Sequence, residues 1–244
     1  MNNSSVNIDV VWLGQGGFLF IVDKVRIIVD PYLSDSLAKR GIPRMIPVPI
    51  KTEDLNPDYV LITHDHADHF DEETMCSLTS LYPECIFIGP ESVRNHYRNM
   101  HFNLDRFVLL NKWMEYEGTG FTVKAVPAYH TDIFSVGFII NNQNKRIYIT
   151  GDTLLDSNLI PELKSTFRKQ TDLLMVCING KLGNMDDKEA IKLVEAINPS
   201  ITIPMHYGMF ESNTIDPTLF FTTLMQRGFK CELMNPGITK RFKL

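Results

Sequence analysis

The sequence predicts a mixed α/β protein of the α+β type. Short apolar runs rich in β-branched and aromatic residues recur along the whole chain, and such runs are typical of strands that are buried on both faces. Helix signals lie between several of these runs. No Pro/Gly/Ser-rich linker or low-complexity stretch divides the 244 residues, so we expect one domain over residues 1–244.

Strands are expected at the apolar runs. In chain order these are Val10–Leu13, Phe18–Val22, Val25–Val29, Tyr59–Ile62, Cys85–Ile88, Phe107–Leu110, Phe121–Val126, Ile133–Ile140, Arg146–Ile149, Leu173–Ile178, Ile201–Ile203 and Cys231–Met234. The first two runs are joined by Gly14-Gln15-Gly16-Gly17. We attribute these glycines to turn geometry rather than to phosphate binding.

Three helices are expected from their amino-terminal signals. Asp186 can cap a helix in which Glu189 follows three residues later. The apolar stripe of that helix would contain Ala190, Ile191, Val194 and Ile197. A second helix would start at Asp216-Pro217 and end near Gly228. A third would carry Asp71, Glu72 and Glu73 at its first turn, and these helices would cover the outer faces of the sheets.

One long irregular segment lies between Tyr32 and Leu55. It contains Pro43, Pro47 and Pro49 and the basic residues Lys39, Arg40 and Arg44. Loops of this length in a compact domain are often functional. Local positive charge of this kind is what an acidic protein needs in order to hold an anion.

Composition excludes several classes of partner. The formal net charge of −5 argues against a general affinity for nucleic acid, which depends on clustered Lys and Arg. Residues Met1 to Asn7 show no basic region followed by an apolar stretch, and no run reaches membrane-spanning length. We expect a soluble, cytoplasmic protein with no nucleic-acid or membrane partner, and the sequence leaves open a homo-oligomer. Buried reduced thiols are expected at Cys76, Cys85, Cys177 and Cys231.

The most informative motif places three imidazoles and two carboxylates within seven residues, Thr63-His64-Asp65-His66-Ala67-Asp68-His69. The motif directly follows an expected strand. Imidazole nitrogens and ionised carboxylates are ligands of divalent metals such as zinc and manganese. If the chain stays extended, His64, His66 and Asp68 share one face because side chains alternate along a strand. A turn can then bring His69 to the same point.

Three further potential ligands follow β-like runs in the same way, namely His130, Asp152 and His206. We therefore expect four strand ends to converge at one edge of a pair of sheets. Five of the seven histidines lie at these strand ends. The other two, His96 and His101, lie in a polar stretch without an arrangement of carboxylates, and we interpret them as surface residues.

This pattern resembles a known family. In type and order, the residues His64, His66, Asp68, His69, His130, Asp152 and His206 resemble the ligand signature of the metallo-β-lactamase superfamily. The segments Ile28–Ser34, Ile178–Gly180 and Pro204–Phe210 resemble its L-ascorbate-6-phosphate lactonase branch. The resemblance implies an αββα four-layer sandwich and a metal-dependent hydrolase with lactonase or esterase activity.

The resemblance also implies how two divalent ions, Zn or Mn, would be held. His64, His66 and His130 would bind the first ion, Asp68, His69 and His206 the second, and Asp152 would bridge them. Seven ligands are too many for a closed four-coordinate structural site, which favours two open metal positions. Such a pair lowers the pKa of a shared water toward neutrality, so a metal-bound hydroxide would attack the substrate. Asp68 would orient that hydroxide.

A small anionic ester or lactone is the expected substrate, with a sugar-acid phosphate lactone as the most specific candidate. Asn179, Lys181 and Tyr207 flank positions that resemble substrate-facing ones, although each alone is equally compatible with a loop residue. Asp65 is expected to orient a ligand or its loop by hydrogen bonds. Asp30 is expected either to do the same or to form a turn before Pro31.

Other functions compete with this interpretation. A metal-dependent phosphodiesterase or nuclease uses similar ligands, but the acidic charge weighs against it. Oxygen reduction at a di-iron site would need an acidic residue where this chain has His66. A non-enzymatic metal-binding scaffold on the same fold is the third alternative, and the complete ligand set argues against it.

Overall fold

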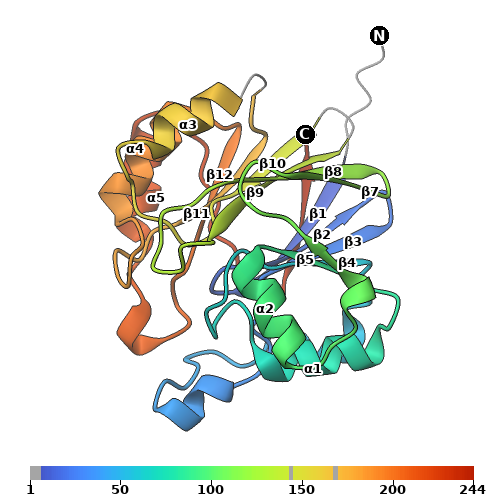
Figure 1. Ribbon diagram of the computed structural model, residues 1–244. Helices are drawn as coiled ribbons and strands as arrows, with labels where there is room; N and C mark the ends of the chain where they lie inside the picture. The colour runs from blue at the N-terminus through green and yellow to red at the C-terminus, as the bar shows by residue number, and fades with distance from the viewer. Residues whose placement is uncertain (1–6, 143–144, 167–169) are drawn as a thin grey trace.

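Two β-sheets face each other and carry helices on their outer sides (Figure 1). The computed structural model describes residues 7–142, 145–166 and 170–244. The sequence analysis found no basic region followed by an apolar stretch in Met1 to Asn7. All of these residues except Asn7 lie outside the described residues. The order of layers is helices, sheet, sheet, helices, and the expected αββα sandwich is confirmed.

The first sheet has the strand order β13-β1-β2-β3-β4-β5-β6. Its strands are β1 (Asn7–Gly14), β2 (Gly17–Val22), β3 (Val25–Val29), β4 (Tyr59–Leu61), β5 (Ile86–Gly89), β6 (Phe107–Leu109) and β13 (Thr239–Lys243). β3 and β4 pair in parallel. Their carboxyl ends therefore lie at the same edge, where the chain continues into Asp30 and into the ligand loop 63–69.

The second sheet has the order β12-β11-β10-β9-β8-β7. Its strands are β7 (Glu115–Gly118), β8 (Phe121–Pro127), β9 (Val136–Asn142), β10 (Lys145–Ile149), β11 (Leu173–Cys177) and β12 (Ile201–Met205). β8 and β10 both pair antiparallel with β9, so they run in the same direction. β10, β11 and β12 are mutually parallel. The chain therefore leaves β8, β10 and β12 at one common edge.

Side-chain alternation along the strands assigns each residue to a layer. In β1, Val10 and Trp12 point between the two sheets, whereas Val11 and Leu13 belong to the cluster under the helices of the first sheet. That outer cluster is covered by α1 (Glu72–Leu81) and α2 (Glu91–Asn99). The opposite outer face is covered by α3 (Leu159–Thr166), α4 (Asp187–Ile197) and α5 (Thr218–Gln226) (Figure 1).

The three expected helices are confirmed together with their start signals. Asp71 caps α1 by accepting from the N–H of Thr74. Asp186 and Glu189 form a reciprocal capping box at the start of α4. α5 begins after Pro217 and ends two residues before Gly228.

Several expectations about elements were wrong or incomplete. β9 starts at Val136 rather than at Ile133, whose side chain is 86% exposed in the preceding loop. Cys231–Met234 forms no strand, and only an isolated bridge joins Cys231 to Thr202. The sequence analysis missed α2, α3, β7 and β13. α2, β7 and β13 carry few apolar residues, and α3 spans only eight residues. Cys76 is exposed, unlike the other three cysteines.

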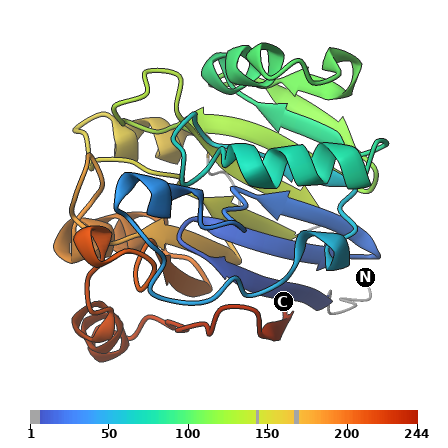
Figure 2. The ribbon, with the colours of Figure 1, turned by 90° about the horizontal axis from the view of Figure 1, so that it is seen from below.

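The long segment from Tyr32 to Leu55 is irregular, as expected. It contains only two short 3₁₀ turns, Ser36–Arg40 and Thr52–Asp54, and it crosses the face seen in Figure 2. Among the described residues, no helix is both long and apolar enough to cross a membrane.

Candidate metal centre

The seven expected ligands meet at the common edge of the two sheets. Parallel pairing brings out His64, His66, Asp68 and His69 after β4, and His130, Asp152 and His206 follow β8, β10 and β12. Within the described residues, three sets of side chains have ligand atoms within 4.8 Å of one another. One set is His64, His66 and His130; another is Asp68, His69 and His206; the third is His64, His69 and Asp152.

The first two sets are the two triads that the family resemblance implies. In the first triad, His66 Nδ1 lies 3.0 Å from His64 Nε2 and 3.1 Å from His130 Nε2. In the second, His69 Nε2 lies 3.4 Å from His206 Nε2. Three ring nitrogens facing one point cannot all be satisfied by hydrogen bonds to one another.

Asp152 lies between the triads. Its carboxylate is 3.4 Å from His69 Nε2, 3.0 Å from His206 Nε2 and 3.9 Å from His130 Nε2. The side chain is 5% exposed, and its Oδ1 has no hydrogen-bond donor among the described residues. This is the position of a carboxylate that could bridge two cations.

The outward nitrogens of the same rings already have partners. His69 Nδ1 is 2.8 Å from the Asp30 carboxylate, His64 Nδ1 is 3.0 Å from Thr63 Oγ1, and His130 Nδ1 is 3.0 Å from the carbonyl of Gly183. For His69 and His130, these acceptors fix a proton on Nδ1 and so leave the Nε2 lone pair facing inward. Inward lone pairs from several rings and an orphaned buried carboxylate oxygen fit divalent cations. The side chains are therefore positioned to bind metal.

The electrostatics of the cluster point the same way. Burial by itself lowers the pKa of His69, but the carboxylates of Asp152 and Asp68, with Asp30, outweigh burial and raise this pKa well above its usual value. Burial raises the pKa of Asp152, yet His206 and His69 outweigh it and hold that pKa well below its usual value. The negative charge of these carboxylates therefore favours a positive charge within the cluster.

Asp30 joins the end of β3 to the ligand loop. Its carboxylate accepts hydrogen bonds from the Thr63 N–H (2.7 Å), from Thr63 Oγ1 (2.6 Å) and from His69 Nδ1. The side chain is fully buried. These contacts hold the His69 ring in place, and the role of Asp30 in orienting a ligand stays a prediction.

Gln15 is a site residue that the sequence analysis missed. Its amide nitrogen donates to Asp68 Oδ2 (2.8 Å) and lies 3.2 Å from both ring nitrogens of His206. The backbone carbonyl of Gln15 accepts from the backbone N–H of His206 (3.0 Å). A Cβ on the next residue, Gly16, would lie 2.8 Å from Cε1 of His69. The glycine-rich turn therefore does more than reverse the chain, because it admits the ring of a ligand.

Four residues near this centre have an unfavourable backbone conformation. Gln15, Asp30, Leu182 and His206 all have positive φ angles, between 43° and 68°. Residues other than glycine seldom adopt this region, and such conformations cluster at functional sites. The contacts around these residues hold them there.

The three residues expected to meet substrate lie in different surroundings. Asn179 is 3% exposed and donates to Asn213 Oδ1 (2.7 Å), and its own Oδ1 accepts from Asn184, which also donates to Asp152 (2.8 Å). Tyr207 packs its ring 4.8 Å from that of Trp12. Lys181 is exposed and donates to the carbonyl of Ser212 (3.1 Å). Contact of these three with a substrate stays a prediction.

The interpretation of His96 as a surface residue without carboxylates was wrong. Its Nδ1 lies 2.5 Å from Asp65 Oδ1 and its Nε2 3.1 Å from Glu72 Oε1, while the ring stacks on Phe70 at 4.3 Å. The fold brings Asp65 of the ligand loop and Glu72 of α1 to the two nitrogens of this α2 residue, and their separation from it in sequence concealed these contacts. This contact joins Asp65 of the ligand loop to α2, and its role in orienting a ligand or the loop stays a prediction. His101 is exposed.

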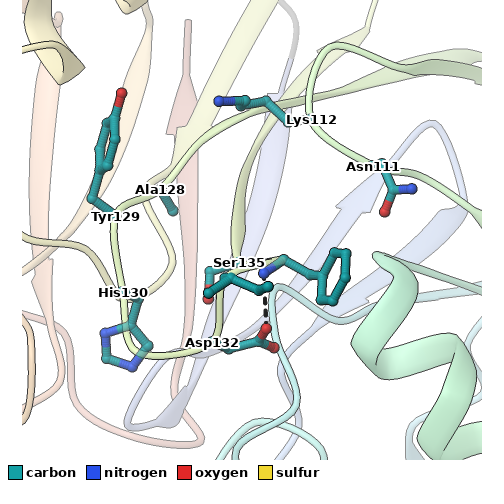
Figure 3. A pocket seen from close by; sticks show the side chains of 9 residues that line it. Asn111, Lys112, Ala128, Tyr129, His130, Asp132 and Ser135 are labelled. Carbon is teal, nitrogen blue, oxygen red and sulfur yellow. Dashed lines mark hydrogen bonds between the residues drawn. The ribbon is translucent and has the colours of Figure 1, made fainter.

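A second anchor of this loop is Asp132, which the sequence analysis did not single out. Its Oδ2 accepts from the Asp65 N–H (3.0 Å) and from Ser92 Oγ (2.6 Å), and its Oδ1 accepts from the N–H of Phe134 (2.9 Å). Figure 3 shows Asp132 and His130 on the same loop. One carboxylate thus ties α2, the ligand loop and the His130 loop together.

Comparison with known proteins agrees with this geometry. The model of the β-lactamase superfamily domain matches residues 9–206. A UPF0173 metal-dependent hydrolase of Methanopyrus kandleri is 29% identical over 249 aligned positions, which cover 93% of this chain and 97% of the relative.

Two solved structures share the fold. Igni18, a metallo hydrolase from Ignicoccus hospitalis, superimposes with a TM-score of 0.81 at 22% identity and covers 98% of this chain and 99% of its own. An isothiocyanate hydrolase from Delia radicum gut bacteria superimposes with a TM-score of 0.77 at 17% identity. The match covers 96% of this chain and 99% of the hydrolase chain. Because the family model spans most of the sequence, this chain belongs to the β-lactamase superfamily domain family.

Proposed function

We propose that this metal-dependent hydrolase cleaves a carboxylic ester or lactone bond with two divalent ions, Zn or Mn, bound by the seven-residue cluster. The observation that carries the proposal is the inward convergence of ligand atoms from four strand ends. When bound, the ions would supply a coordinated water of lowered pKa and a Lewis acid for the electrophilic oxygen.

The chain's own residues would position the reactants. The Asp68 side chain is 18% exposed and lines a cavity beside the cluster, together with His66. Gln15 holds Asp68 Oδ2 by a hydrogen bond. The same carboxylate could accept a hydrogen bond from the attacking water through Oδ1 and so orient it.

The lining of this cavity favours a neutral electrophile over a phosphodiester. Among the described residues that line it, none is Lys or Arg. A phosphodiester carries charge that cationic side chains usually stabilise, whereas a carbonyl carbon needs no such group beyond the metal centre. The narrower expectation of a sugar-acid phosphate lactone would rely on Lys181, which is bonded to the cavity residue Ser212.

A parallel assay tests the proposal. The protein would be stripped with a chelator, reloaded with Mn²⁺ or Zn²⁺, and given alkyl lactones, carboxyl esters, a phosphorylated sugar-acid lactone and phosphodiesters at equal concentration. We expect turnover of esters or lactones that chelation abolishes and metal restores. Faster cleavage of a phosphodiester would favour a phosphodiesterase, and metal binding without any turnover would favour the scaffold.

A further inference from the structure

A cavity of about 360 Å³ adjoins the metal cluster, and its walls are mainly apolar. His66 and Asp68 line the side at the cluster. The apolar part of the lining is formed by Leu37, Ile42, Ala67, Leu182 and Phe210. The volume lies within the range of small-molecule sites, which are typically apolar with a few polar groups placed for orientation. Here the polar groups at the cluster side are two of the expected ligands.

The basic residues expected to attract an anion are held elsewhere. Arg44 is half-buried; its guanidinium donates to the carbonyls of Tyr32 (2.8 Å) and Ile46 (3.1 Å) and lies 5.2 Å from the centre of the Tyr32 ring. Lys39 forms an ion pair with Glu73. Neither residue, nor Arg40, lines the cavity. The hydrogen bonds of Arg44 thus stabilise the conformation of the long segment. The side chains of this segment that line the cavity are Leu37 and Ile42, and neither carries charge.

The exposure and backbone conformation of Leu182 independently indicate an apolar binding surface at this cavity. Its side chain is 74% exposed, so it contributes little to the core. Its φ of +52° is unfavourable for a branched apolar residue, whereas Gly and Asn adopt this region readily. It precedes Gly183, whose carbonyl accepts from His130 Nδ1. An exposed leucine in a strained conformation beside the centre has no evident value for folding, but it offers apolar surface to a ligand.

We propose that this cavity binds an alkyl or aryl group of the substrate, attached to the ester or lactone that reacts at the cluster, and that Leu182 and Ile42 determine this specificity. The inference rests on the proposed function for the bond that is cleaved. Ile42 is 37% exposed, so both side chains still have surface that a bound alkyl group would cover. Each buried methylene should raise kcat/KM about fourfold until the cavity is filled.

The first experiment is a chain-length series on the metal-loaded protein. Esters with one leaving group and acyl chains from acetate to octanoate would be compared with an ester of hexanoate length that ends in a carboxylate. We expect kcat/KM to rise with chain length and to fall at least tenfold for the charged chain. A flat series, or a preference for the charged chain or for a phosphorylated sugar-acid lactone, would overturn the inference and leave the hydrolase function intact.

The second experiment uses Leu182→Asn, because asparagine tolerates the left-handed backbone and folding should be preserved. We expect unchanged metal content and melting temperature, and a loss of kcat/KM that is about tenfold for octanoate esters and clearly smaller for acetate esters. Leu219→Asn is the matched control, since Leu219 is 61% exposed on α5 and does not line the cavity. An equal loss for acetate and octanoate esters would remove Leu182 from the specificity site.

A binding measurement separates the two proposals. Titration calorimetry would compare octanoate with acetate on the metal-loaded wild type and on Leu182→Asn. Tighter binding of octanoate that Leu182→Asn weakens supports the apolar cavity even if no ester is turned over, in which case only the proposed function fails. Equal affinity of the two carboxylates would overturn the cavity proposal whatever the turnover.

Discussion

Asp30 shows what a single side chain contributes to the ligand cluster. It accepts from two groups of Thr63 and from His69 Nδ1, and it does so at a φ of +43°. The carboxylate fixes the orientation of a ligand ring from the side that faces away from the cluster. Loss of a partner of this kind typically lowers metal affinity by about 10- to 100-fold.

Asp30→Asn should lower the affinity for the metal by roughly 10- to 100-fold. Asparagine keeps the left-handed backbone but presents an amide that cannot accept from all three donors. Competition with a chromogenic chelator would measure the change. The matched control is Asp23→Asn, an exposed aspartate at φ +48° in the turn between β2 and β3. Wild-type affinity in Asp30→Asn would show that the His69 contact has no role in metal binding.

His96 illustrates a residue whose role depends on its neighbours in space. His96→Ala should lower the free energy of unfolding by about 1–2 kcal/mol, because it removes the hydrogen bond to Asp65 and the stacking on Phe70. Urea denaturation would measure the loss. His101→Ala should change nothing, and metal content should stay high in both variants, since neither residue is a ligand. Equal stability of the two variants would contradict this role for His96.

At the scale of elements, α4 depends on its capping box. Asp186→Ala removes the acceptor for the Glu189 N–H (2.8 Å) and should cost about 1 kcal/mol of stability. Asp186→Ser retains a capping oxygen and should recover most of the loss. Chemical denaturation of the two variants tests the assignment, and an equal cost for both would mean that the cap is not the cause.

The edge strand β13 is fastened to β1 by an ion pair between Asp9 and Arg241. The hydrogen bond and charge of Arg241 hold the pKa of Asp9 below its usual value, against a small opposing effect of burial. Because the pKa of Asp9 is lower in the folded than in the unfolded protein, its ionised carboxylate stabilises the fold above the unfolded-state pKa near about 4. This stabilisation is lost as the pH falls through the folded-state pKa. Arg241→Ala should therefore be slightly less stable than wild type at pH 7.

That difference should start to shrink near about pH 4, where the unfolded chain takes up the proton, and should vanish once the pH falls below the lowered folded-state pKa of Asp9. Denaturation of the wild type and of Arg241→Ala across this pH range would measure it. Lys243→Ala on the same strand is the control and should show no such pH-dependent difference. A difference that is constant with pH would contradict the ion pair as its source.

At the scale of the whole molecule, the metal centre joins the two sheets. Its ligands come from β4 in one sheet and from β8, β10 and β12 in the other. Ions bound there should therefore link the layers and stabilise the entire fold. The cluster otherwise combines buried carboxylates with facing ring nitrogens, an arrangement that costs free energy without a cation.

Addition of Zn²⁺ or Mn²⁺ to the stripped protein should raise its stability by about 2.7 kcal/mol for each ion bound, at a free concentration 100 times the dissociation constant. Elemental analysis at saturation should find more than one metal equivalent. His66→Ala and Asp152→Ala should lose most of the metal and of the thermal shift, and His101→Ala should retain both. Full metal content in both ligand variants would refute the assignment.

The sequence by itself determined the strands that the potential ligands follow, three of the five α-helices in the described part of the chain, and the set of potential ligands. These features are local: a strand is recognisable from its apolar run, a cap from residues three apart, and a ligand from its position just after a strand. The convergence of four strand ends could also be anticipated, since parallel neighbours end at the same edge of a sheet.

Only the tertiary structure decided which other side chains meet at that edge. Gln15 reaches Asp68 and His206 across 53 and 191 residues of sequence, and nothing in its turn distinguishes it from a surface glutamine. The guanidinium of Arg44 donates hydrogen bonds to backbone carbonyls of its own segment. The side chain of Leu182 is exposed and lines the cavity. These roles depend on the packing of loops from different layers, and no local pattern encodes packing between distant segments.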